Sequence, residues 1–201
     1  MSLTLLVLCT ANQCRSPMAG ALLDRALQRA QVAAIVVSAG FGRDGVSSPA
    51  GTLHAAERQG LSLEHHRSRR LTATDLRAAD VVLVMERGHV QQAVVTDVTC
   101  WPKCFTLKEL VRRAHGIGRR GTDEAFADWL ARLHEGRRPA DLLTGRREDD
   151  DVRDPVGASD RVFQEVADEL AALVEDFVDL AFPRGVHGRT AQPSPAQERR
   201  R

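Results

Sequence analysis

A cysteine and an arginine near the start of the chain have the spacing that phosphate chemistry needs. Five residues separate Cys9 from Arg15, and Ser16 follows directly. In such a tight turn, successive backbone N–H groups can point inward and bind an anion, aided by the positive end of a following helix. Arg15 can hold two phosphate oxygens through its planar guanidinium. The same positive field favours the thiolate of Cys9, which would then act as a nucleophile.

The residues around this pair predict the structure that positions them. An apolar run at 3–8 predicts a strand before the loop, and Pro17 favours a helix start after it. Ser16 is expected to cap that helix and to donate a hydrogen bond to sulfur. Asn12 suits a left-handed backbone position. A lone cysteine here would more often be an inert buried thiol, but this context favours the nucleophile.

With these motifs the chain resembles the low-molecular-weight protein tyrosine phosphatase family of the bacterial type, over residues 3–89 and about 152–182. Besides the loop, the segments found in the family's order are Ser38-Ala39-Gly40, His66-Arg67-Ser68-Arg69, Ala79-Asp80 with the following apolar run, and Asp154-Pro155. The resemblance implies a protein-tyrosine-phosphatase, a hydrolase of phosphomonoesters that needs no cofactor and forms a phosphocysteine intermediate.

The resemblance also implies a role for each matching residue. Cys9 is the nucleophile, Arg15 binds the phosphate, Ser16 stabilises the thiolate and Asp154 is the general acid. His66 holds the loop from behind through Asn12. The expected substrate-binding residues are Thr10, Ala11, Asn12, Gln13, Cys14, Arg15, Ser16 and Phe41.

Several positions depart from the family pattern. Ala11 stands where the family usually has glycine, and alanine is harmless there only at negative φ. Gln13 is polar where an aliphatic residue is common, which weakens apolar contact with a phosphotyrosine ring. Val156-Gly157 replaces the aromatic residues often found after Asp-Pro, and the chain has no tyrosine. Phe41 is therefore the expected aromatic wall.

The remaining histidines and cysteines predict no metal site. Adjacent His65 and His66 diverge, and the Cys100 and Cys104 spacing fits neither a zinc site nor a C-x-x-C redox motif. These two cysteines are expected to be ordinary buried thiols. Cys14 has two open interpretations, because it is either an apolar filler or, by resemblance, the partner of Cys9 in a reversible disulfide.

Composition narrows the class of protein. The chain has 201 residues, 43% of them hydrophobic, and a formal net charge of +1 from 28 basic and 27 acidic residues. This length favours one domain, and the balanced charge recommends neither nucleic acid nor a membrane as partner. Residues 1–8 lack the features of a signal peptide, so we expect a cytoplasmic protein. Nothing in the composition sets the oligomeric state.

The apolar patterns predict an α/β fold. Short runs at 3–8, 34–38, 81–85 and about 104–107 indicate buried parallel strands. Helical patterns lie between them at 17–30, 49–60 and 72–78, and a long amphipathic helix begins near Ser159. We therefore expect a single doubly wound, flavodoxin-like domain with a four-stranded parallel sheet, and Cys9 at the carboxyl end of its strand.

The domain is expected to span 1–183, with an insertion at about 112–150 and a disordered tail at 184–201. The insertion predicts a helix from Phe126, Trp129, Leu130 and Leu133. Its arginine pairs either present cations to an anionic substrate or partner near Asp154, or form a solvated face without a role in recognition.

Two other functions compete with phosphatase activity. A thioredoxin-coupled arsenate reductase uses a similar loop, but it needs a cysteine directly after the third strand, where this chain has Met85-Glu86. A non-catalytic phosphoprotein-binding module would explain Ala11 and Gln13. Such a module requires neither Cys9 nor Asp154, so hydrolysis of a phosphotyrosine protein or another phosphomonoester is the favoured function.

Overall fold

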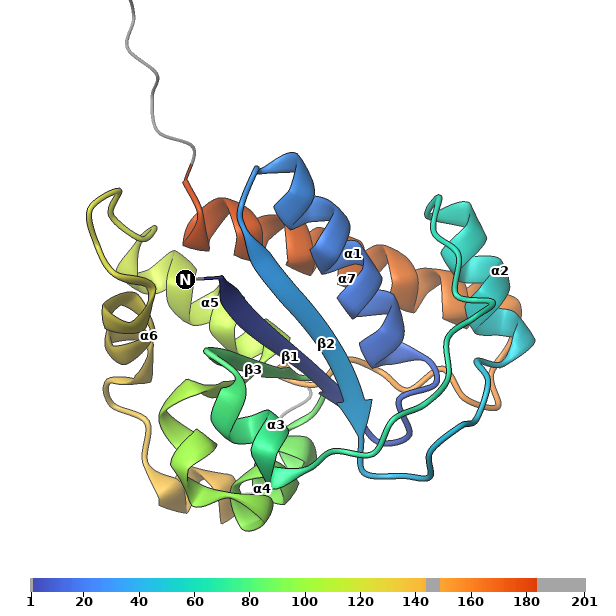
Figure 1. Ribbon diagram of the computed structural model, residues 1–201, viewed down its shortest axis with the longest axis horizontal. Helices are drawn as coiled ribbons and strands as arrows, with labels where there is room; N and C mark the ends of the chain where they lie inside the picture. The colour runs from blue at the N-terminus through green and yellow to red at the C-terminus, as the bar shows by residue number, and fades with distance from the viewer. Residues whose placement is uncertain (1, 144–148, 184–201) are drawn as a thin grey trace, which may run out of the picture.

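The computed structural model describes residues 2–143 and 149–183 and contains a four-stranded parallel sheet between helical layers (Figure 1). The strands are β1 Leu3–Cys9, β2 Ala34–Gly40, β3 Val81–Val84 and β4 Cys104–Thr106, arranged in the order β2-β1-β3-β4. All pairings are parallel. The predicted doubly wound α/β fold is confirmed. Each observed strand ends within two residues of the end predicted from the sequence.

Helices follow the strands along the chain. Up to β4 they are α1 Arg15–Arg29, α2 Ala50–Arg58, α3 Ala73–Ala78, α4 Arg87–Thr96 and the 3-10 helix η1 Val98–Lys103. After β4 come α5 Leu107–Ile117, α6 Phe126–His134, the 3-10 helix η2 Pro139–Leu143 and α7 Asp160–Ala181. None of the described helices is long and apolar enough to span a membrane.

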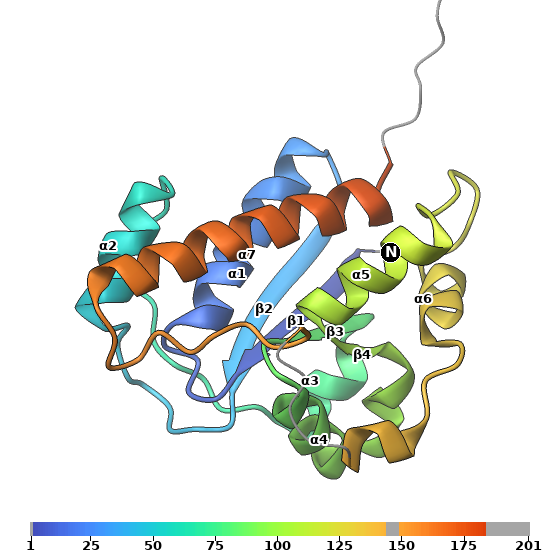
Figure 2. The ribbon, with the colours of Figure 1, turned by 180° about the vertical axis from the view of Figure 1, so that it is seen from behind.

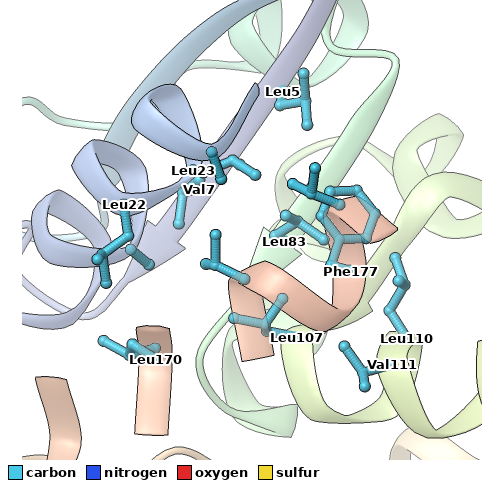
Figure 3. Packing of buried hydrophobic residues seen from close by; sticks show 14 of the residues in the cluster. Leu5, Val7, Leu22, Leu23, Leu83, Leu107, Leu110, Val111, Leu170 and Phe177 are labelled. Carbon is cyan, nitrogen blue, oxygen red and sulfur yellow. The ribbon is translucent and has the colours of Figure 1, made fainter. Parts of the chain in front are cut away.

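Alternate residues of each strand pack on opposite faces of the sheet, as strand geometry requires. Leu5, Val7 and Leu83 belong to the core beneath α1, α5 and α7, and Figure 3 shows them facing Leu22, Leu110 and Phe177. Leu6, Leu8 and Val82 belong to the core beneath α3 and α4. Because both faces are covered, the strands read as continuous apolar runs.

Helix α7 crosses the outside of α1 and also packs on α2 and α5 (Figure 2). Most of its apolar positions are buried, and Leu170 and Phe177 are fully so. This long helix follows directly on the segment that carries Asp154. The core therefore fixes both ends of the site: the loop after β1 and the segment before α7.

The segment predicted as an insertion contains α6, the helix expected from its apolar spacing, and η2. Trp129 and Leu133 of α6 are fully buried and join the main core. The indole nitrogen of Trp129 donates to the carbonyl oxygen of Gly118 at 3.3 Å. Helix α6 is thus part of the packed structure. The tail predicted at 184–201 lies outside the described residues.

Replacing Trp129 with alanine should lower the free energy of unfolding by about 3–5 kcal/mol, because the indole is fully buried and its loss leaves a cavity. Urea denaturation followed by circular dichroism would measure it. The control is Val95→Ala at a side chain that is 88% exposed, which should change stability by less than about 0.5 kcal/mol. A loss below about 1 kcal/mol for Trp129→Ala would show that α6 lies outside the cooperative core.

Candidate active site

The loop between β1 and α1 closes around Asn12. Asn12 has φ of 54°, the left-handed conformation expected from the sequence, and it is fully buried. Its side-chain amide donates to the hydroxyl oxygens of Ser16 at 2.9 Å and Ser38 at 3.0 Å. Its side-chain oxygen accepts from the backbone N–H of Arg69 at 2.8 Å. These bonds compensate the strain of the left-handed backbone and tie the loop to β2 and to the segment after α2.

His66 supports the same loop from the other side. Its Nε2 lies 2.8 Å from the carbonyl oxygen of Asn12, and because a carbonyl only accepts, the imidazole donates. This is the contact that the family resemblance implies for His66. The ring therefore holds the backbone of Asn12 in place.

Cys9 and Ser16 meet at the bottom of the loop. The Sγ of Cys9 lies 3.0 Å from the Oγ of Ser16, and both side chains are buried. Since the Ser16 oxygen accepts a hydrogen bond from Asn12, its proton is available to the sulfur. The arrangement suits a thiolate, which is stabilised by a hydroxyl donor and by the N-terminus of α1.

The expectation that Ser16 caps this helix is wrong. Helix α1 begins two residues earlier than expected, at Arg15, with Cys14 in the capping position and no side-chain cap. Ser16 is the second residue of the helix, and its hydroxyl contacts Cys9, Asn12 and the carbonyl oxygen of Ala39 instead of capping α1. Pro17 is consequently the third helical residue. The N–H groups of the first helical residues have no partner within the helix, so the lack of an N–H on Pro17 costs no hydrogen bond.

Ala11 fits the loop in spite of its departure from the family pattern. Among the described residues, the non-glycine positions with positive φ are Asn12 and Gln31, so Ala11 has no left-handed strain. The close approach is instead made by Gly40 at the end of β2. A Cβ atom on Gly40 would lie 2.7 Å from the backbone nitrogen of Asn12 and 2.9 Å from the carbonyl carbon of Ala11. Only glycine lets β2 and the loop pack this closely.

Arg15 links the loop to two distant segments. Its side chain is only 2% exposed and pairs with the carboxylates of Glu86, after β3, and Asp154, whose Oδ2 lies 2.7 Å from Nη2. It also donates to the carbonyl oxygen of Val152 at 3.0 Å and to the Thr10 hydroxyl at 3.4 Å. Cys9, Arg15, Ser16 and Asp154 thus converge on one site although the sequence separates them by up to 145 residues.

The structure adds Glu86 and His89, which sequence reasoning missed. His89 is buried, and its Nε2 lies 2.9 Å from the Thr10 hydroxyl oxygen. Burial lowers the pKa of His89 to about 4, so the ring is neutral near pH 7. Both residues follow β3, the neighbour of β1, and a search of the residues just after each predicted strand could have found them.

Phe41 and Gln13 lie beside the loop. The Phe41 backbone N–H donates to the carbonyl oxygen of Thr10 at 2.8 Å, and its ring stacks on His89 with centroids 5.7 Å apart. The ring also lines a hollow of about 560 Å³ that extends to Leu71 and Val95. Gln13 is half-buried within the loop.

All four cysteines are free thiols. Cys14 is buried, and desolvation raises its pKa to about 11, so it remains protonated and a weak nucleophile near neutral pH. Cys100 and Cys104 are fully buried, as expected, and share a hydrogen bond. Over residues 2–143 and 149–183, no group of three or more His, Cys, Asp or Glu residues could hold a metal ion.

Comparison with known proteins identifies the family of this fold and loop. The model for low molecular weight phosphotyrosine protein phosphatases matches residues 4–118, more than half of the chain. The chain belongs to this family. This phosphatase is 31% identical to the probable low molecular weight protein-tyrosine-phosphatase EpsP of Ralstonia solanacearum, over 66% of the chain and 90% of EpsP.

Other relatives cover more of this phosphatase. The protein-arginine-phosphatase of Bacillus subtilis is 31% identical over 85% of the chain and 91% of its own length. The crystal structure of a YwlE mutant from Bacillus subtilis superimposes with a TM-score of 0.67 at 26% identity, over 89% of this chain and 97% of that one. A YwlE arginine phosphatase mutant with a phosphorylated active site serine superimposes with a TM-score of 0.66 at 25% identity, over 88% and 94% of the two chains. These relatives favour neither arsenate reduction nor non-catalytic binding.

Replacing Gly40 with alanine should lower kcat/KM for p-nitrophenyl phosphate at least about tenfold, because the added methyl forces the backbone at Ala11 and Asn12 away from β2. Steady-state kinetics would measure the loss. Gly116→Ala is the matched control, since its Cβ on α5 meets nothing within 4 Å. Equal kinetics for the two variants would contradict the close packing assigned to Gly40.

Proposed function

We propose that this phosphatase hydrolyses phosphomonoesters on proteins through a phosphocysteine formed at Cys9. The observation that carries the proposal is the convergence on one loop of a thiol, a hydroxyl donor, a buried guanidinium and a carboxylate, contributed by Cys9, Ser16, Arg15 and Asp154. Binding alone would need neither the thiol nor the carboxylate. Together they supply a nucleophile, a site for negative charge and a proton donor.

In the first step the Cys9 sulfur attacks phosphorus while the bond from phosphorus to the ester oxygen breaks. The guanidinium of Arg15 and the backbone N–H groups of the loop bind the phosphoryl oxygens, where negative charge is spread in the transition state. The Ser16 hydroxyl, 3.0 Å from the sulfur, stabilises the thiolate before attack. The loop is held in place by Asn12 and His66, so little reorganisation is needed.

Asp154 gives its proton to the leaving oxygen. When Arg15 binds a phosphoryl group, its ion pair with Asp154 weakens and the carboxyl group is free to contact the leaving oxygen. In the second step the Asp154 carboxylate takes a proton from water as the water oxygen attacks phosphorus. The bond from sulfur to phosphorus then breaks and the Cys9 thiolate is restored.

Phosphotyrosine is the proposed substrate residue. The stacked rings of Phe41 and His89 form an apolar wall beside Thr10, in place of the aromatic residues that the chain lacks after Pro155. Because His89 is neutral, it adds no cation that would compete with Arg15 for the phosphate. The hollow along Phe41, Leu71 and Val95 offers space for residues beside the phosphotyrosine.

Cys9→Ser should abolish phosphate release from p-nitrophenyl phosphate and from a phosphotyrosine peptide, because it removes the nucleophile. Asp154→Ala should reduce kcat by about 10²–10⁴-fold on the peptide, whose leaving group needs a proton, and less on p-nitrophenyl phosphate. Assays with EDTA and a reductant would measure both.

The matched control is Asp168→Ala, a change of the same kind on the outer side of α7, which should leave kcat unchanged. Wild-type activity retained by Cys9→Ser would exclude the phosphocysteine. If the wild-type protein turned over neither substrate, the proposed hydrolysis would be wrong.

Phosphoarginine is the second candidate substrate, and specific observations support it. The relative that aligns over 85% of this chain is a protein-arginine-phosphatase. Gln13 also places a polar side chain in the loop where an aliphatic one would favour an aromatic ring. A polar residue at this position is compatible with a guanidinium leaving group.

Gln13→Leu should raise kcat/KM for a phosphotyrosine peptide relative to a phosphoarginine peptide by roughly tenfold, because an apolar contact replaces a polar one. Both peptides would be assayed with the same sequence around the phosphorylated residue. An unchanged ratio would show that Gln13 does not select the substrate. The wild-type ratio itself decides which of the two phosphorylated residues is preferred.

A further inference from the structure

A second cavity, of about 250 Å³, lies between α4, α5 and the segment that links α6 to η2. It shares no lining residue with the loop after β1. Its charged lining consists of the guanidinium groups of Arg87, Arg112, Arg113, Arg137 and Arg138 and the carboxylates of Glu109, Asp141 and Asp150. The indole of Trp101 also lines it. Among described residues, this lining therefore has an excess of positive charge.

Two of the arginines are matched by carboxylates. Arg137 is bidentate to Glu109, at 2.9 and 3.2 Å, and its guanidinium lies 4.0 Å from the ring centre of Trp101. Arg138 pairs with Asp141 at 3.3 Å, three residues along the chain. These pairs leave no net charge.

Of the other three arginines, Arg87 and Arg112 share one carboxylate, whereas Arg113 makes no ion pair among the described residues. Asp150 is 2% exposed and pairs with Arg112 at 2.8 Å and with Arg87 at 3.5 Å. Arg113 donates to the backbone carbonyl oxygens of Leu133 and Glu135. These carbonyls accept from two of its nitrogens, and because they are neutral they do not balance the charge of the guanidinium.

Further features support a site for negative charge. The Nε of Arg87 is buried and has no hydrogen-bond partner in the described structure. Burial lowers the pKa of His134, and the positive charges of Arg137 and Arg113 lower it further. The field around the cavity thus opposes a further cation. An unpaired buried donor together with surplus guanidinium charge is the environment that an oxyanion stabilises.

We propose that this cavity binds a small phosphate-type oxyanion through Arg87, Arg112 and Arg113. Planar guanidinium groups match the oxygens of a phosphate, and several of them around one cavity suit a dianion. The volume lies below the range of about 300–1,000 Å³ that drug-sized ligands occupy, which favours a small anion. The observations behind this proposal do not depend on the reaction proposed for Cys9.

An anion bound in this cavity would lie next to the segment that carries Asp154. Asp150 begins that segment, and Asp151 accepts from the backbone N–H of Arg87 at 2.8 Å. Two residues after Asp150, the carbonyl oxygen of Val152 accepts a hydrogen bond from Arg15. A bound anion competes with Asp150 for Arg87 and Arg112, so its occupancy is coupled to the position of the general acid.

The two tryptophans allow a direct test. In ¹⁵N-labelled protein, titration with inorganic phosphate against chloride at equal ionic strength should shift the indole N–H resonance of Trp101 in a saturable way. The indole resonance of Trp129, which is buried in the core away from the cavity lining, should stay in place. Arg113→Ala should weaken the phosphate affinity read from Trp101 by roughly tenfold.

Arg112→Ala provides a second variant if the loss of Arg113 disturbs α6, because its side chain is half exposed and the change is milder. It should weaken the affinity similarly, with an unchanged Trp129 resonance reporting an intact fold. Arg161→Ala removes the same charge from an exposed position on α7 and should have no effect. A Trp101 shift that never saturates, or that survives unchanged in both cavity variants, would overturn the proposal.

Discussion

The buried guanidinium of Arg15 is the interaction on which the site depends. A charge that is 98% removed from solvent must be paired, and no single neighbour in the loop can do it. Glu86 comes from the end of β3, and Asp154 and Val152 come from the segment before α7. Pairing one side chain therefore brings three distant parts of the chain together. The same guanidinium is the group that a phosphate ester would bind.

The parallel sheet makes this convergence possible. In β1, β2 and β3 the carboxyl ends lie at one edge, where Cys9 is level with Gly40 and Leu8 with Val84. Each strand therefore contributes the residues that follow it to the same place. β2 contributes the close approach at Gly40 and the ring of Phe41, and β3 contributes Glu86 and His89. The backbone at this edge of the sheet determines where the site lies, and the side chains that follow the strands supply its reactive groups.

The arginines near η2 differ in how their charge is balanced. Arg137 is a structural residue: its guanidinium lies between the rings of Trp101 and Phe105, pairs with Glu109 and fastens the end of α6 to β4. Arg87 and Arg112 share the buried carboxylate of Asp150, and Arg113 contacts backbone carbonyls, so these three are the arginines proposed to bind an anion. The solvated face that the sequence allowed does not describe Arg137, whose side chain is 4% exposed, and anion binding by the other arginines stays a proposal.

The sequence by itself determined the strands, most helices and the loop at Cys9, because periodicity and short motifs are local and each depends on neighbouring residues. It also determined Asp154 as a candidate, through a motif. Only the tertiary structure revealed Glu86, His89, the role of Gly40 and the arginine cavity, since each depends on contacts between distant segments. It also overturned the helix cap expected of Ser16, while the predicted contact of Ser16 with Cys9 is present. A capping oxygen must lie just before the helix, and only the folded chain shows that α1 begins at Arg15, which places Ser16 inside it.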